Sequence, residues 1–375
     1  MKICCLADAS SIHIKKWVSY FVKKGYDMHV ISFEDGIIEG ANVHRIQMLF
    51  LFRNKTFLLK LMYMGKIKKI IKEIKPDILH AFYVTNYGYF ASKMDFHPLI
   101  VSAQGSDILK VGTESKLLTY IKKKIAQKVV KKIDLILIEG NKIKNKLFYD
   151  YRVDPKKMVM QQSGVDVEKF KPDIDSLVIK NKLDINGRLS VISLRNFYPE
   201  YDVKTLIRAI PAVIDVYPTC KFIVAGKGSQ EEKLRELATK LKIMQPYNLE
   251  FIGHIENDDL PKYLNAVDIY VSTASTDSGI SMSTAEAMAC GLPVIVTDVE
   301  DNSDWIENKV NGFLIPFEYV VSLSERIVRL LDDKNLRKEF GKLGRKTIVE
   351  RDNYDEEMKN MENIYEKIYG SFVDV

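Results

Sequence analysis

The chain has 375 residues, more than one typical hydrophobic core holds, and its length fits two domains. Hydrophobic residues make up 46% of it, which is enough for two cores. No apolar run approaches the roughly 18 residues that span a bilayer, and Met1 to Asp8 has the pattern of a first strand, so we expect a cytoplasmic protein. Reduced core cysteines, without disulfide or zinc-ligand spacing, are predicted at Cys4, Cys5, Cys220 and Cys290.

The net charge of +6 hides an asymmetry along the chain. Residues 1–175 hold 31 Lys and Arg against 18 Asp and Glu, and the rest holds 25 against 32. Arg53–Lys75 and Lys110–Lys132 each carry eight basic residues and one acidic residue. These segments could bind an anionic membrane surface or a lipid-diphosphate acceptor, or simply form solvated lysine faces. An apolar stripe that we expect to join the core recurs every four residues at Leu117, Ile121, Ile125, Val129 and Ile133.

Strands and helices alternate from the first residues onward, as in a doubly wound α/β domain. After a strand at 2–8, a helix near 17–24 and a strand at 28–33, the pattern predicts strands at 77–83, 98–103, 134–139 and 158–162. Phe170–Gly187 is the candidate linker. Alternation restarts at 188–194 and continues to Pro316, and three helices follow at 320–331, 335–351 and 354–369. We therefore predict domains at 1–175, with the last helix at about 354–370, and at 186–352.

The segment from Asp277 to Val294 reads D-S-G-I-S-M-S-T-A-E-A-M-A-C-G-L-P-V. A buried strand precedes it, and its small residues let backbone N–H groups approach a ligand at the start of a helix near Ser281. Glu286 lies five residues into that helix, so its carboxylate can reach the same place. This arrangement favours a site for an anion with hydroxyl groups beside it, although an ordinary strand, loop and helix packing unit would look similar.

At Glu286 to Ile295 the chain resembles the retaining nucleotide-sugar glycosyltransferases of family 4 (group 1). Their hallmark is a Glu, seven residues, then a second Glu followed by A-M-A-x-G-x-P-V-I. The second half matches nearly letter for letter, whereas Ser278 replaces the first Glu, with Asp277 one position earlier. The resemblance implies the GT-B fold, which has two Rossmann-like domains facing across a cleft and a C-terminal helix that crosses back to the first domain. It also implies no cofactor and no metal.

The resemblance assigns the nucleotide sugar to the second domain. Arg195 ends a strand where the family has a phosphate-binding Arg, but Tyr201 stands near the usual Lys, and Lys204, a little farther on, is the candidate substitute for it. A surface role for Arg195 and a solvent-facing His254 are the alternative interpretations. We predict catalytic roles for Arg195, Glu286, Asp277 and Ser278. Predicted donor contacts are Gly279, Ile280, Ser281, Thr284, Gly226, Lys227, Gly253, His254, Ile255 and Lys204.

The resemblance places the acceptor on the first domain. The loop after the first strand contains Ser11 and His13 in place of the family's glycine-rich sequence, which implies a different acceptor. His80 and the Q-G-S-D segment, with Gln104 and Asp107, match the family's strand-end patterns, except that Gln104 replaces a frequent His. We predict acceptor contacts at Ser11, His13, His80, Gln104 and Asp107.

Together these features predict a metal-independent, retaining transfer of a sugar from a UDP- or GDP-linked donor. The acceptor would be a glycan or a lipid-linked glycan in cell-surface polysaccharide or glycolipid synthesis, with the protein cytoplasmic or peripheral on the inner face of the cell membrane. We expect no nucleic-acid partner. Two alternatives remain open: a sugar-nucleotide epimerase of the same fold, and a non-catalytic nucleotide-sugar-binding subunit.

Overall fold

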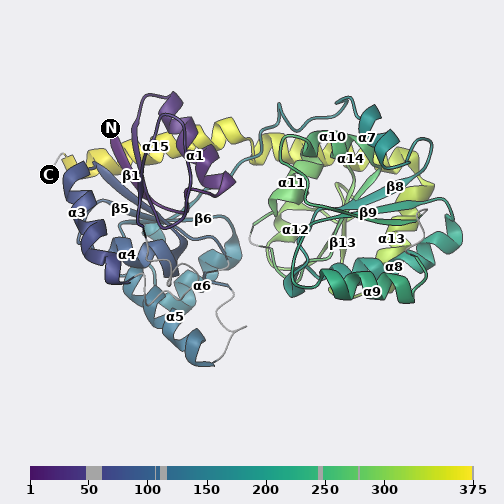
Figure 1. Ribbon diagram of the computed structural model, residues 1–375, viewed down its shortest axis with the longest axis horizontal. Helices are drawn as coiled ribbons and strands as arrows, with labels where there is room; N and C mark the ends of the chain where they lie inside the picture. Colours follow the sequence, from purple (N-terminus) through teal and green to yellow (C-terminus); the bar gives the residue numbers. More distant parts are fainter. Residues whose placement is uncertain (48–60, 106, 110–115, 244–247, 278, 374–375) are drawn as a thin grey trace. The chain divides into compact units, whose positions relative to one another are not determined.

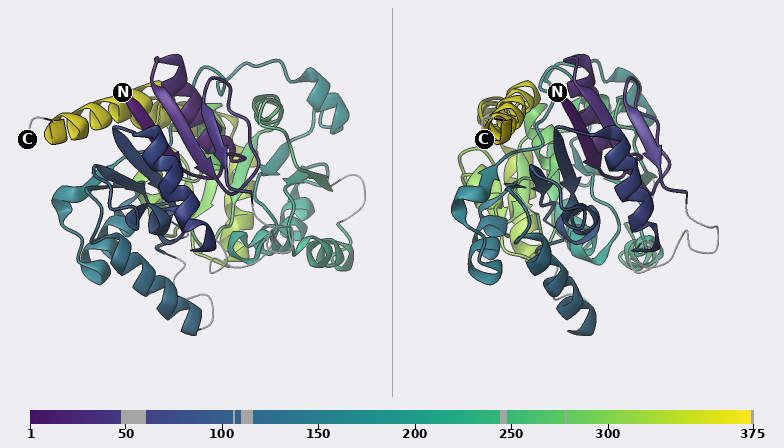
Figure 2. Two further views of the ribbon diagram at one scale, coloured as in Figure 1. Left: turned by 60° about the vertical axis from the view of Figure 1, so that its left-hand side comes forward. Right: turned by 90° about the vertical axis from the view of Figure 1, so that its left-hand side faces the viewer.

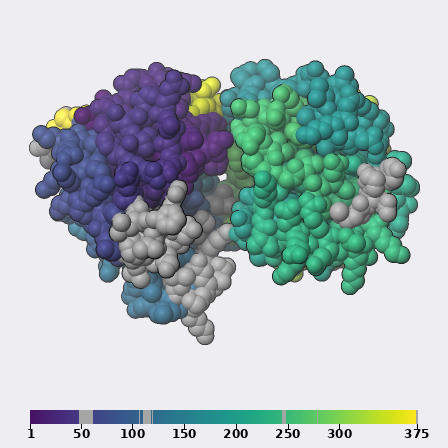
Figure 3. Space-filling model, viewed as in Figure 1, coloured from purple at the N-terminus to yellow at the C-terminus, as the bar shows by residue number. Residues whose placement is uncertain are grey.

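In the computed structural model the chain forms two compact units (Figure 1). The structure describes residues 1–47, 61–105, 107–109, 116–243, 248–277 and 279–373. One unit comprises Met1–Ser163 with Glu356–Val375, and the other comprises Gly164–Asp355. Figure 3 shows the units in space-filling form, with the residues outside the described ranges in grey. The boundary follows Ser163, and the predicted linker at 170–187 lies inside the second unit, where Phe170, Leu183 and Ile185 are core residues.

The first unit is built on a parallel sheet of seven strands in the order β3-β2-β1-β4-β5-β6-β7. Continuous apolar runs such as Leu99–Ser102 suit strands that are covered on both faces. The sequence pattern did not predict the four-residue strand β3, which pairs with β2 at the sheet edge and carries no buried side chain. The strands are β1 (Lys2–Leu6), β2 (Asp27–Ser32), β3 (Asn42–Arg45), β4 (Ile78–Phe82), β5 (Leu99–Ser102), β6 (Leu135–Ile138) and β7 (Met158–Met160).

Helices pack on this sheet and bury its two faces (Figures 1 and 2). The last helix, α15 (Tyr354–Val373), places Met358, Met361 and Tyr365 at helical spacing into the first unit's core, beside Trp17 of α1. The expected return of the C-terminal helix to the first unit is confirmed. The other helices are α1 (Ile12–Lys23), α3 (Met64–Ile74), α4 (Gly88–Ser92), α5 (Lys116–Val129) and α6 (Asn141–Tyr151), with short helical turns η2 (Leu61–Tyr63), η3 (Tyr83–Tyr87) and η4 (Pro155–Lys157).

The second unit is built on a parallel sheet of six strands in the order β10-β9-β8-β11-β12-β13. Its strands are β8 (Ser190–Ser193), β9 (Lys221–Ala225), β10 (Leu249–Gly253), β11 (Ile269–Ser272), β12 (Val294–Thr297) and β13 (Phe313–Ile315). Its helices are α7 (Leu177–Lys182), α8 (Val203–Val216), α9 (Glu231–Lys240), α10 (Leu260–Ala266), α11 (Met282–Ala289), α12 (Asn302–Trp305), α13 (Val320–Asp332) and α14 (Lys334–Arg351), with the turn η5 (Pro199–Tyr201). The predicted fold of two doubly wound parallel sheets is confirmed.

Core packing in the second unit is divided by the sheet into two clusters. One includes Tyr270, Val294 and Met288 with Ile348 of α14, and the other includes Phe222, Ile207 and Ile327. Helix α11 is short and almost entirely buried, because small residues in M-S-T-A-E-A-M-A let it pack closely against its neighbours. A rigid, buried α11 fixes the backbone at its N-terminus and the side chain of Glu286.

Candidate functional site

Strand order locates a binding edge in the second sheet. From β8 the chain runs outward to β9 and β10, then returns to the other side of β8 with β11, so the order reverses between β8 and β11. In open α/β sheets, ligands bind beyond the carboxyl ends of the strands at such a reversal. Arg195 follows β8 by two residues, and Asp277 follows β11 by five.

Arg195 and Asp277 form a buried ion pair at this edge. The guanidinium Nη2 lies 2.5 Å from Asp277 Oδ1, and Nη1 lies 3.4 Å from Ser283 Oγ. The two side chains are 7% and 5% exposed. Burial is the largest single effect and would lower the pKa of Arg195, but the charge of Asp277, its hydrogen bond and the nearby Tyr270 and Tyr201 together raise the pKa, so the arginine stays charged. The site therefore holds a fixed positive charge next to a carboxylate.

Part of this ion pair lacks a hydrogen-bond partner. Arg195 Nε and Asp277 Oδ2 are both buried and bond to nothing among the residues that the structure describes. Buried polar atoms nearly always have a partner, so each exception needs an explanation, such as strain, an ordered water or a functional role. A donor and an acceptor thus remain available at the sheet reversal.

Tyr201, which stands near the position of the lysine in the resembled family, lies against Arg195. The Arg195 guanidinium carbon lies 4.5 Å from the centroid of the Tyr201 ring, a cation–π arrangement that holds the guanidinium plane. Lys204, the predicted substitute, instead contacts Glu318 at 2.8 Å and Asp202 at 3.5 Å. These acidic partners engage its charge, so the conformation seen here gives no support to a donor role for Lys204.

The loop after β9 packs directly on the loop after β8. A Cβ on Gly226 would lie 2.4 Å from the Arg195 carbonyl oxygen, and one on Gly228 would lie 2.4 Å from that of Phe197. Gly226 has φ +152, and the Lys227 carbonyl accepts a hydrogen bond from the Phe197 amide at 3.0 Å. Both glycines are needed for this close approach, which fixes the backbone that carries Arg195.

Helix α11 begins after Ser281 at the same edge. Ser281 Oγ lies 2.8 Å from Thr284 Oγ1, and the Tyr270 hydroxyl lies 2.8 Å from Ser283 Oγ. Glu286 is 6% exposed, and its charge, after burial, is among the causes that raise the pKa of Cys290 to about 12. Ile280 packs against the core. The predicted residue Ser278 lies outside the described residues.

Two predicted backbone contacts are already occupied. The Gly279 amide donates to Asp301 Oδ2 at 3.3 Å, so the expected open amide at Gly279 is not seen. The Gly253 carbonyl accepts from the Gly226 amide at 2.8 Å, which ties the loops after β9 and β10 together. His254 is exposed, with Nε2 3.8 Å from a Glu256 carboxylate oxygen, and the Ile255 side chain is buried.

In the first unit the His80 side chain lies inside the core. His80 is fully buried at 0% exposure, with Nδ1 2.6 Å from the Tyr365 hydroxyl and Nε2 2.8 Å from Ser102 Oγ. Burial lowers the pKa of His80 to about 3, so the ring is neutral. Both nitrogens are engaged inside the core, so in this conformation His80 anchors α15, and its acceptor contact stays a prediction.

The carboxylate of Asp107 is also engaged, because it binds backbone amides. Its carboxylate accepts hydrogen bonds from the amides of Val84 and Gln104, and the side chain is buried. Burial raises its pKa to about 6. The contact to Val84 lies in the first turn of η3, so Asp107 holds the loop after β4. The structure gives Asp107 this structural role, and its acceptor contact stays a prediction.

The other predicted acceptor residues lie at the carboxyl edge of the first sheet. Ser11 caps the start of α1 by position, without a side-chain hydrogen bond at the helix start, and His13, the second residue of the same helix, is exposed. Gln104 is half-buried after β5. Sequence reasoning missed Glu139, which follows β6 at this edge, accepts from Ser163 Oγ at 2.6 Å and has a pKa raised by burial to about 7.

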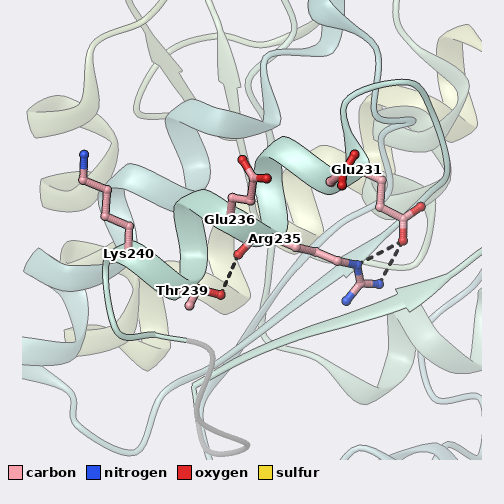
Figure 4. Close-up of a pocket in the computed structure, with 6 residues that line it drawn as sticks. Glu231, Arg235, Glu236, Thr239 and Lys240 are labelled. Carbon is pink, nitrogen blue, oxygen red and sulfur yellow. Dashed lines mark hydrogen bonds and ion pairs between the residues drawn. The ribbon is translucent and has the colours of Figure 1, made fainter.

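A shallow surface depression runs along α9 (Figure 4). Its lining residues all belong to that one helix, and the Arg235 guanidinium bonds to Glu231 across a single turn. None of the predicted donor or acceptor residues lines it. The described residues contain no group of three His, Cys, Asp or Glu side chains that could hold a metal ion.

Comparison with known families agrees with the site and the fold. The model of "Glycosyl transferases group 1" matches residues 175–347, and the model of "Glycosyl transferase 4-like" matches residues 2–139. The protein is a GT-B glycosyltransferase. The chain belongs to the group 1 glycosyltransferases.

Two of the relatives are named as transferases that act on lipid-linked sugars. The chain is 25% identical over 321 residues to the Escherichia coli UDP-Gal:alpha-D-GlcNAc-diphosphoundecaprenol alpha-1,3-galactosyltransferase, covering 83% of this chain and 81% of the relative. It is 32% identical over 192 residues, 49% of each chain, to a GDP-mannose-dependent monoacylated alpha-(1-6)-phosphatidylinositol monomannoside mannosyltransferase of Corynebacterium glutamicum.

Solved structures share the fold across nearly the whole chain. Sucrose-phosphate synthase from Thermosynechococcus elongatus superimposes with a TM-score of 0.86 at 16% identity, covering 99% of this chain and 100% of the other. Anabaena HepE in complex with UDP-glucose gives a TM-score of 0.81 at 18% identity, covering 98% and 100%. At these identities the likeness establishes the GT-B fold alone.

Proposed function

We propose that the protein transfers a sugar, with retention at the anomeric carbon, from a UDP- or GDP-linked donor to a glycan or lipid-linked acceptor. The observation that carries the proposal is the buried Arg195, positioned at the reversal of the second sheet with an unpartnered Nε among the described residues. A nucleoside diphosphate develops negative charge as it leaves, and a fixed cation at that place stabilises the charge. The nucleotide-dependent relatives support the donor class.

In this mechanism each side chain has a defined task. Arg195 and the N-terminus of α11 bind the diphosphate, Glu286 accepts hydrogen bonds from hydroxyl groups of the donor, and Asp277 orients the sugar. The leaving phosphate oxygen takes the proton of the acceptor hydroxyl as the new glycosidic bond forms, so the step uses no protein nucleophile. The charge balance relies on side chains and a helix end, and on no metal.

Ligand binding gives the first test. UDP, GDP and ADP are compared by the rise in melting temperature, since a ligand at 100 times its Kd adds about 2.7 kcal/mol to the free energy of unfolding. Transfer to a lipid-diphosphate-linked glycan is then measured with the matching donor sugar. Interconversion of the donor without acceptor, followed by NMR, would replace the proposal by an epimerase, and binding with neither transfer nor donor hydrolysis would replace it by a non-catalytic subunit.

Glu286 gives the second test. Glu286→Ala should lower kcat/KM for the donor at least tenfold, about 1.4 kcal/mol of transition-state binding. Glu325→Ala, which removes an exposed carboxylate from α13 of the same unit, should leave kcat/KM unchanged. Unchanged kinetics in Glu286→Ala would refute the assigned role.

We also propose that α5 contacts an anionic membrane surface. The predicted core stripe is buried only from Val129 onward, while Leu117, Tyr120 and Ile121 are 70%, 59% and 44% exposed. Helix α5 projects from the first unit in Figures 1 and 2. Lysines 122–124 and 128 follow this apolar end. Apolar side chains beside a cluster of lysines fit the head-group region of anionic lipid, each Lys contributing about 1 kcal/mol.

Helix α3 differs from α5, because its apolar residues Ile67, Ile71 and Ile74 are buried, while its lysines and Glu73 face outward. The part of the predicted basic segment at 53–60 lies outside the described residues. Of the helices described, none combines the length and hydropathy needed to cross a bilayer.

Flotation with phosphatidylglycerol vesicles tests the membrane proposal. Wild-type protein should float at low salt and be released at high salt. The double substitution of Leu117 and Ile121 by serine should reduce flotation several-fold, whereas Ile37→Ser, at a loop residue that is 88% exposed, should not change it. Protein that stays behind at low salt would show that the lysines form a solvated face.

A further inference from the structure

The ion pair between Arg195 and Asp277 has a feature that diphosphate binding by itself does not explain. In the conformation seen here the positive charge expected to bind the diphosphate is already neutralised by the carboxylate. Tyr201, which covers the guanidinium, is uncharged and adds no second positive charge. A dianionic ligand that entered this site unchanged would meet Asp277 as well as Arg195, and like charges at close range repel.

The contacts of Arg195 with Tyr201 and Ser283 position the guanidinium, and its ion-pair partner Asp277 could be exchanged without breaking them. The Tyr201 ring covers one face of the guanidinium at 4.5 Å, and Ser283 Oγ lies 3.4 Å from Nη1. Of the described residues, only Asp277 forms an ion pair with Arg195. Asp277 binds through Oδ1, and its buried Oδ2 has no partner within the described part of the chain.

We propose that the donor diphosphate displaces Asp277 from Arg195, so that Asp277 acts both as a lock on the free enzyme and as the sugar-orienting carboxylate of the loaded one. When a phosphate oxygen takes the place of Oδ1 at Nη2, the freed carboxylate can accept hydrogen bonds from sugar hydroxyls. Tyr201 is a positioning residue, because its ring keeps the guanidinium in place during the exchange. This inference rests on the proposed function.

Because the Asp277 carboxylate and the diphosphate compete for Arg195, removing the carboxylate charge should change the affinity for the nucleotide. Removing the negative charge of Asp277 leaves a buried guanidinium without a counter-ion, which is unfavourable in a low-dielectric site. A diphosphate that supplies the missing charge should then bind more tightly than it binds to the wild type. The sugar loses its carboxylate at the same time, so tighter binding of the product accompanies slower transfer.

Isothermal titration of UDP and GDP into the wild type and Asp277→Asn tests this directly. The variant should bind the preferred nucleotide at least tenfold more tightly, and its kcat for transfer should fall at least tenfold. The matched control is Asp184→Asn, because Asp184 Oδ2 lies 3.0 Å from Arg188 Nη1 in an exposed ion pair before β8. The control should bind and turn over like the wild type.

Substitutions of Tyr201 give a second test that leaves the ion pair between Arg195 and Asp277 intact. This test can be used even if Asp277→Asn does not fold. Tyr201→Leu should weaken binding of the same nucleotide about fivefold, and Tyr201→Phe, which keeps the ring, should restore it. A structural role alone would lower the melting temperature without this restoration of affinity.

The outcomes separate the inference from the function on which it rests. Nucleotide binding that is equal or weaker in Asp277→Asn overturns the exchange, as does wild-type affinity in Tyr201→Leu, while the proposed function stands. Failure of UDP, GDP and ADP to bind the wild type removes the proposed function and the inference together.

Discussion

Removing the hydroxyl of Tyr365 should destabilise the first unit by breaking a buried connection between three segments. The hydroxyl lies 2.6 Å from His80 Nδ1 of β4 and 3.3 Å from Trp17 Nε1 of α1. Neutral His80 can accept from the hydroxyl, and Trp17 can only donate to it. Tyr365→Phe would therefore leave one buried acceptor and one buried donor without partners.

The expected loss follows from these two groups. Each buried polar group left unsatisfied costs about 1–3 kcal/mol. The Phe side chain fits the same space, so no cavity term is added, and we expect a total of about 2–6 kcal/mol. For a unit of this size, 1 kcal/mol corresponds to a shift in Tm of about 2–4 °C. The melting transition of the first unit should thus fall by about 4–24 °C.

Differential scanning calorimetry, with urea unfolding followed by Trp17 fluorescence, measures the change. The matched control is Tyr20→Phe. The Tyr20 hydroxyl of α1 donates a hydrogen bond to Glu362 of α15 at 3.1 Å, in a partly solvated position. That loss should stay below 1 kcal/mol. Equal effects of the two substitutions would show that the buried hydroxyl does not anchor α15 and would refute the structural role assigned to His80.

Three further predictions concern the two units separately. Gly226→Ala should weaken nucleotide binding at least tenfold, because the new Cβ would lie 2.4 Å from the Arg195 carbonyl oxygen; titration calorimetry with UDP and GDP checks it. The pKa values of Asp107 and Glu139 are raised to about 6 and 7, above the roughly 4 of unfolded carboxyls, so the folded unit retains protons that the unfolded chain releases. Its free energy of unfolding should therefore fall as pH rises from about 4 to 7, and urea titrations of Asp107→Asn should show a shallower fall. Burial raises the pKa of Cys290 to about 12, so iodoacetamide should label it only after unfolding.

Much of the fold could be predicted from local patterns. Apolar runs such as L-I-V-S at Leu99–Ser102 identify strands buried on both faces, and Met358, Met361 and Tyr365 mark one face of a helix. These patterns work because burial repeats with the period of the element. Strand β3 was missed since an edge strand with no buried residue carries no such period. The predicted linker lies inside the second unit, because Phe170 belongs to a non-repetitive segment that nevertheless joins the core.

The sequence by itself determined the parts of the site that lie within one segment, above all Glu286 behind the loop of α11 and the position of Arg195 at a strand end. Only the tertiary structure decided what these groups contact. It brought Asp277 and Tyr201 to Arg195 across the sheet reversal, and it placed His80 in the core against Tyr365, 285 residues away in sequence. The physical reason is that a motif fixes the chemistry and local spacing of side chains. Their partners, their burial and therefore their charge state depend on which strands the fold sets side by side.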